Sequence, residues 1–126
     1  MTTKTELAVR AGEYIISESP GSRSRDQVTV EAAALSTLLL AGTVLAKRTS
    51  TGEYARFAVG GADGTGTAVA IAHRTIPSGA AAKRTTVNSR DMEANGNKLT
   101  WPAGITGPQK TAAEAQLAQQ GIIVRY

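Results

Sequence analysis

The hydrophobic positions of this chain are concentrated in one stretch, residues 35–59. Its first half is the densest apolar run. A polar turn at residues 49–52 then leads into an alternating segment in which Ala55, Phe57 and Val59 share one face. Two β-prone runs separated by a glycine-bearing turn are typical of strands that fold back on each other. The stretch therefore predicts a β-hairpin from which the core is built.

Further segments alternate apolar and polar residues and predict additional strands. They cover residues 25–31, 68–74, 84–92 and 122–124. In the second of them, Val69, Ile71 and His73 share one face, and alanines occupy the other. Such a face of small residues allows another backbone or another subunit to approach closely. Residues 60–67 are rich in glycine and predict a flexible surface loop between two strands.

The last part of the chain predicts one short helix followed by a strand. Residues 110–120 are strong helix formers, Pro108 suits the first helical position, and Gly121 suits the glycine cap after the last turn. Ala113 and Leu117 are four residues apart and share one helix face. A single helix among many strands predicts an α+β, mainly β fold.

The first 24 residues have a different character from the rest. They are rich in polar residues and glycine, and their only β-prone patch is Tyr14, Ile15 and Ile16. We predict a flexible N-terminal arm at residues 1–24 and a β-rich domain at residues 25–126. The patch is consistent with a disordered tail, or with a segment that adds a strand to a partner's sheet and becomes ordered only on binding.

Composition narrows the functional classes. The 126 residues include no cysteine, which excludes disulfides, thiolate metal sites and a cysteine nucleophile. Aromatic residues make up only 4% of the chain, so we expect a small aliphatic core that gains part of its stability from association. No apolar run approaches the ~20 residues of a membrane span. The N-terminus lacks a signal-peptide pattern, so we expect the protein to stay in the cytoplasm where it is made.

Residues that could support catalysis or hold a cofactor do not form a recognisable pattern. His73 is the only histidine, no carboxylates flank it at metal-ligand spacing, and no serine-nucleophile motif is present. We therefore expect His73 to be a surface or interface residue. Asp91 and Glu93 would share a strand face, which we interpret as a solvated edge. The loop 60–67 lacks the P-loop ending. We predict no enzyme, metal or cofactor.

The net charge of +4 favours an acidic partner surface without requiring nucleic acid. The basic candidates are the pairs 47–48 and 83–84 together with Arg90, and no pair of aromatic residues lies between them in the sequence to stack bases. A small basic nucleic-acid-binding protein remains an alternative, but we expect no direct nucleic-acid contact. We expect no membrane partner either.

Several segments, in their order and spacing, resemble the head decoration protein family of tailed phages, whose best-known member comes from phage lambda. The likeness covers roughly residues 13–126. The residues that carry it are 14–18 (YIISE), 20–21 (PG), 24–26 (SRD), 41–47 (AGTVLAK), Gly52, Tyr54, 62–66 (ADGTG), Trp101–Pro102 and the ending 117–125.

The resemblance implies a small β-tulip-like domain that forms a homotrimer on the outer surface of the phage head. It implies binding to the major capsid protein at the three-fold positions of the expanded head, reinforcement of that lattice, and neither cofactor nor catalysis. A tail or baseplate structural protein is a further alternative. The residues expected to contact the capsid are Tyr14, Ile15, Ile16, Ser17, Arg23 and Arg25. The residues considered for a subunit interface are Trp101, Pro102 and His73, and the first two could instead pack in the core.

Overall fold

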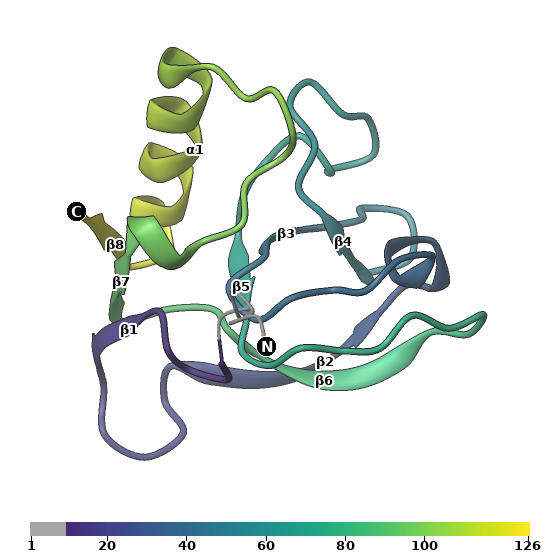
Figure 1. The fold of residues 1–126 in the computed structure, drawn as a ribbon, viewed down its shortest axis with the longest axis horizontal. Coiled ribbons are helices and arrows are strands. Elements are labelled where there is room, and N and C mark those ends of the chain that lie inside the picture. The colour runs from purple at the N-terminus through teal and green to yellow at the C-terminus, as the bar shows by residue number, and fades with distance from the viewer. Residues whose placement is uncertain (1–9) are drawn as a thin grey trace, which may run out of the picture.

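A closed barrel of five strands forms the larger part of the fold, and a three-stranded sheet covered by one α-helix adjoins it (Figure 1). This computed structural model describes residues 10–126. The mainly β, α+β fold predicted from the sequence is confirmed. The elements in chain order are β1 (Ile15–Glu18), β2 (Arg25–Val30), the 3-10 helix η1 (Ala32–Leu35), β3 (Val44–Lys47), β4 (Tyr54–Arg56), β5 (Ala70–Ala72), β6 (Lys83–Asn88), β7 (Met92–Asn95), the 3-10 helix η2 (Gly96–Lys98), α1 (Gly107–Gln119) and β8 (Ile122–Arg125).

The barrel strands follow the order β2-β4-β3-β5-β6, and β6 pairs with β2 to close it. The longest pairing is antiparallel between β2 and β6, from Arg25 opposite Asn88 to Val30 opposite Lys83. A closed sheet leaves no free strand edge, so its backbone groups are paired around the ring. The barrel is therefore the rigid part to which the other elements attach.

The predicted central hairpin is confirmed as β3 and β4, which pair antiparallel with Lys47 opposite Tyr54. The apolar residues just before this hairpin do not form a strand. Leu39 is buried and forms an isolated bridge with Ile76, whereas the neighbouring Leu38 is exposed. Within this non-strand segment, Leu39 is therefore a core side chain and Leu38 a surface side chain.

The predicted strand at residues 84–92 is in fact two strands, β6 and β7, in different sheets. Between them, Ser89 N donates a hydrogen bond of 2.9 Å to the carbonyl of Ser24. Asp91 then adopts a positive φ of 53°, a conformation that few residues other than glycine adopt. The alternation continues through this turn, so it did not reveal that the chain leaves the barrel there.

The three-stranded sheet has the order β1-β7-β8, with β1 antiparallel and β8 parallel to β7. Helix α1 connects η2 and the following loop to β8. Its N-cap Thr106 forms a capping box with Gln109, and Gly121, after the helix, has a φ of +85°. Ala113 and Leu117 are the buried helix residues, as the four-residue spacing predicts. The predicted helix and final strand are therefore confirmed.

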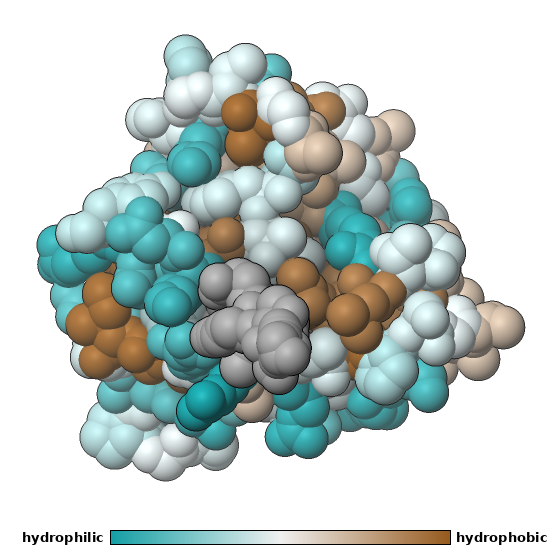
Figure 2. Space-filling model, viewed as in Figure 1, coloured by the Kyte–Doolittle hydropathy of each residue, from teal (hydrophilic) through white to brown (hydrophobic). Residues whose placement is uncertain are grey.

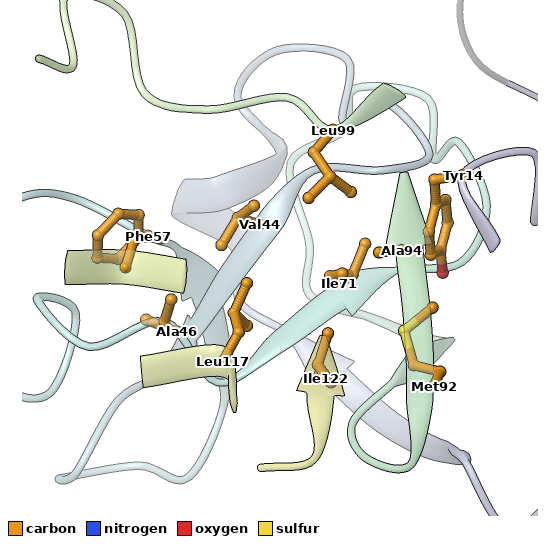
Figure 3. Packing of buried hydrophobic residues seen from close by; sticks show 12 residues of the cluster. Tyr14, Val44, Ala46, Phe57, Ile71, Met92, Ala94, Leu99, Leu117 and Ile122 are labelled. Atoms are coloured by element: carbon orange, nitrogen blue, oxygen red, sulfur yellow. The ribbon is translucent and has the colours of Figure 1, made fainter. Parts of the chain in front are cut away.

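The core consists of two clusters. One fills the barrel beneath η1 and includes Leu35, Leu45, Ala70 and Ala72. The alanine face of β5 is thus covered by this chain's own interior. The second cluster lies between the barrel, the sheet and the helix (Figure 3). Its labelled members are Tyr14, Val44, Ala46, Phe57, Ile71, Met92, Ala94, Leu99, Leu117 and Ile122.

The N-terminal segment, as far as it is described, differs from the flexible arm expected at residues 1–24. Residues 15–18 form β1, which pairs with β7, and Tyr14 is fully buried in the second core cluster. The burial of the Tyr14 ring and the backbone pairing with β7 offset part of the conformational entropy that this segment loses on ordering. Residues 1–9 of the expected arm lie outside the described residues.

Candidate functional site

The outer face of the sheet β1-β7-β8 carries a row of polar contacts that joins all three strands. Ser17 lies opposite Glu93, and its Oγ donates a hydrogen bond of 2.8 Å to Glu93 Oε1. From the opposite side, Arg125 Nε donates to Glu93 Oε2 at 2.8 Å. The Arg125 guanidinium is the main cause that lowers the pKa of Glu93. These contacts hold an ionised carboxylate at the centre of the face.

Apolar and charged side chains project beside this row. Ile16 has 52% of its surface exposed and Ile123 has 37%. Arg23, with 74% of its side chain exposed, forms an ion pair of 3.0 Å with Asp91. Figure 2 shows hydrophobic residues at the surface in the region of β1. We call this area the β1 surface and define it by Ile16, Ser17, Arg23, Glu93 and Ile123.

Strand β1 is also an edge of its sheet, because β7 is its only strand partner among the described residues. A register irregularity between Ile15 and Ser17 shifts the pairing at Ile16. Edge strands present unpaired backbone N–H and C=O groups, which can hydrogen-bond an extended segment of another chain. The β1 surface can therefore offer both side-chain contacts and a strand edge to a partner.

Tyr14 fixes the start of β1 from inside. Its hydroxyl donates a hydrogen bond to Oδ1 of Asn88 on β6, a residue that is itself fully buried. Burial raises the pKa of the Tyr14 hydroxyl well above its usual range, so the group stays protonated. The hydrogen bond satisfies a polar group that would be costly to bury alone. Tyr14 thus attaches the N-terminal segment to the barrel.

Glu18 makes the second attachment, at the end of β1. Its Oε1 accepts hydrogen bonds from Ser24 Oγ at 2.5 Å, Arg25 Nε at 3.1 Å and Asn88 Nδ2 at 3.1 Å. Its Oε2 forms an ion pair of 2.5 Å with Arg25 Nη2. These donors, chiefly Arg25, lower the pKa of Glu18 to about 2. The carboxylate therefore joins β1, β2 and β6 at one point.

The structure divides the residues expected to contact the capsid into two groups. Ile16, Ser17 and Arg23 are exposed on the β1 surface. Tyr14 is buried, and Arg25 is held by Glu18. Ile15, also of this second group, is half-buried and packs against the core cluster. The residues of the second group hold the exposed residues of the first group in place on the β1 surface.

His73, expected to be a surface or interface residue, is not on the surface of the chain. Only 8% of it is exposed, and its ring packs edge-on against Tyr14 with 6.5 Å between ring centroids. The carbonyl of His73 accepts a hydrogen bond of 3.0 Å from Gly12 N. Burial is the main cause that lowers the pKa of His73. The N-terminal segment covers this histidine, and the alternation of residues 68–74 alone could not show that cover.

Two placements were considered for Trp101 and Pro102, one in the core and one at a subunit interface. The structure gives these residues features of both. Trp101 is half-buried and packs against the core cluster. Both residues also line a surface groove of about 340 Å³ between the ends of the hairpin and the loop after η2. Lys110 lies over the outer part of this region, with Nζ 5.7 Å from the Trp101 ring centroid.

The basic pairs considered for nucleic acid are partly neutralised. Arg48 pairs with Glu31 at 2.5 Å, and Arg90 pairs with Asp26 at 2.5 Å. Within residues 10–126, no group of three or more potential metal ligands comes together. No helix in the same part of the chain is long and apolar enough to cross a membrane.

The sequence matches the family model of bacteriophage lambda head decoration protein D over residues 3–122. That match spans nearly the whole chain, including β1, the barrel and α1. The chain belongs to this family. A search of curated proteins found no match. Membership makes the protein a structural component of a phage head, associated with its capsid.

Sequence reasoning missed the residues that hold the β1 surface in place. Asn88 and Glu18 come from strands 70 positions apart, yet they share a hydrogen bond. Neither residue belongs to a local motif. The only available signal was the apolar patch at residues 14–16, which indicated a strand but not its partner.

Proposed function

We propose that the protein binds the outer surface of the expanded phage head as a homotrimer at the three-fold positions and reinforces the lattice of the major capsid protein. The family match over residues 3–122 carries this proposal. The exposed β1 surface supports it, because this surface combines an edge strand with apolar and charged side chains.

The stabilising effect follows from mass action. A protein that binds the expanded lattice, but not competing states of the shell, stabilises that lattice by its binding free energy. In a trimer, the first docked copy holds the other two at high effective concentration near their own sites. Moderate contacts per copy can therefore give tight attachment of the whole trimer.

The proposed capsid contact consists of residues 1–9 together with the β1 surface. The capsid protein supplies an extended segment or loop that meets the open edge of β1 and packs on Ile16. Tyr14 and Glu18 keep the edge in place, so little ordering entropy remains to be lost in β1 when the contact forms.

The substitution Ile16→Asp tests this contact. Ile16 is about half exposed, so the change should leave folding intact while placing a charge in an apolar contact. We expect binding to expanded heads that lack the protein to weaken about tenfold or more in a co-sedimentation assay, which corresponds to ~1.4 kcal/mol per copy.

Val59→Asp is the matched control, because Val59 is 43% exposed and lies away from β1 after the hairpin. It should bind heads like the unchanged protein. Equal binding by Ile16→Asp and the unchanged protein would show that the β1 surface does not contact the capsid.

A further inference from the structure

A groove lined mainly by apolar side chains opens beside the lone tryptophan of the chain. Val44 N donates a hydrogen bond of 3.1 Å to the Thr100 carbonyl, which holds the segment after η2 alongside β3. Trp101 and Phe57 both line this groove, which is open at the surface. Arg56 forms one rim of this groove.

Two donor groups at the groove are incompletely matched among the described residues: Trp101 Nε1 lacks an acceptor, and the Arg56 guanidinium lacks a counterion. Trp101 Nε1 is buried and has no hydrogen-bond partner in the described chain. The Arg56 guanidinium binds only oxygens of the segment 34–38, through Nε and Nη2, and has no carboxylate within 4.0 Å among residues 10–126. A partly buried cation without a counterion favours a partner that brings negative charge.

The same surface carries features that complement the groove. Leu38 is 51% exposed, and its carbonyl accepts a hydrogen bond of 3.0 Å from Arg56 Nη2, so it lies just beyond the rim. Figure 2 shows hydrophobic residues at the surface between β3 and η1, in the part of the barrel next to this segment.

The complementary charge is Glu53. Every other carboxylate side chain within residues 10–126 has an ion pair or a side-chain hydrogen bond, and Glu53 has neither. Glu53 lies just before β4 and Arg56 ends that strand, so about 10 Å separates them along the backbone. The two form no ion pair within one copy, so both are available to a second copy.

We propose that this groove is the contact between copies of the chain: Leu38 of one copy enters the groove beside Trp101 of the next, and Glu53 supplies the counterion for Arg56. The inference rests on the proposed trimer and assigns it a surface. Leu38 adjoins the groove on the same surface. Around a three-fold axis each copy can place its Leu38 in the groove of the next, and three such contacts close into a ring.

The β1 surface is not needed for this contact. Capsid binding and self-association therefore use different residues. Loss of the β1 contact should leave self-association intact, whereas loss of self-association should lower head binding only through lost avidity.

The experiment combines sedimentation velocity with the fluorescence of Trp101, which reports on the groove alone because the chain has no other tryptophan. With rising concentration, the unchanged full chain should shift from monomer to trimer mass, and the Trp101 emission should move to shorter wavelength. Leu38→Asp should weaken association about 30-fold or more and suppress the emission shift. Glu53→Arg should weaken association too, since it places like charges together.

Ile16→Asp is the control for the β1 surface and should associate like the unchanged chain. A chain that stays monomeric up to about 1 mM would overturn the inference. So would trimers that form equally well with Leu38→Asp, in which case the trimer of the proposed function would stand but its contact would lie elsewhere. Loss of head binding with Ile16→Asp while association persists would support both assignments.

Discussion

Glu18 lies where the N-terminal segment meets the barrel, and its carboxylate binds donors from Ser24, Arg25 and Asn88. Because the side chain is mostly shielded from solvent, these hydrogen bonds are not lost to competition with water. The ionised form is favoured so strongly that the pKa falls to about 2, chiefly through Arg25.

The linkage between this pKa and stability predicts an acid effect. The pKa of Glu18 is lower in the folded chain than its ordinary value of 4.5, so its contribution to stability is fully present above pH 4.5. That contribution is lost as pH falls towards about 2. We expect Glu18→Gln to reduce the free energy of unfolding at pH 7 by about 2 kcal/mol. The difference from the unchanged chain should shrink between pH 5 and pH 2.

Urea unfolding across this pH range measures the effect. Glu114→Gln is a suitable control, because that exposed carboxylate accepts a hydrogen bond only from the Tyr126 hydroxyl, which an amide oxygen can also accept. A Glu18→Gln difference that stays constant from pH 7 to pH 2 would contradict the role given to the Glu18 carboxylate.

At the residue scale, the sequence predicted where side chains alternate but not which ones are enclosed. Tyr14 belongs to a short apolar patch in an otherwise polar segment, and its burial depends on β7 and on Asn88, which is 74 positions away. His73 is enclosed by the same segment. Contacts between distant positions decide both cases, and no local pattern encodes them.

At the scale of elements, the C-terminal helix differs from Tyr14 and His73, because local signals specify it. Thr106 Oγ1 accepts a hydrogen bond from Gln109 N, and the Gln109 side chain accepts one from Thr106 N. Gly121 ends the helix with a positive φ that other residues adopt only at a cost. These are local signals, so the helix and the strand after it could be predicted from the sequence within a few residues.

The helix cap provides a prediction at this scale. Thr106→Ala removes the side-chain oxygen that caps the first turn, and we expect a loss of about 1 kcal/mol in the free energy of unfolding. Thr106→Ser keeps the oxygen and should lose only a few tenths of that amount. Chemical denaturation of both variants is the measurement, and equal stabilities of the alanine and serine variants would show that the cap contributes nothing.

The sequence allowed the strands to be predicted, but not which strands pair with each other. The β3–β4 hairpin joins neighbouring segments through a polar turn, so its pairing followed from the sequence. The segment 84–92 continued its alternation across a turn, and only the pairing of β6 with β2 and of β7 with β8 separates it into two strands. Short-range pairing can be predicted from local pattern, whereas sheet membership cannot.

At the scale of the whole molecule, the barrel provides a fixed frame on which two surfaces are displayed. The β1 surface is attached to it through Tyr14 and Glu18, and the groove beside Trp101 is formed where the loop after η2 runs along β3. The family match gives the molecule its place in the phage head. We propose that the first surface binds the capsid and the second binds a neighbouring copy.

Cryo-electron microscopy of expanded heads, prepared with and without the protein, tests the central claim most directly. The account predicts added triangular density on the outer surface at the three-fold positions, made of three copies with β1 towards the shell. It also predicts that heads carrying this density resist heating better than bare heads. Added density at other positions, or single copies without three-fold arrangement, would contradict the account.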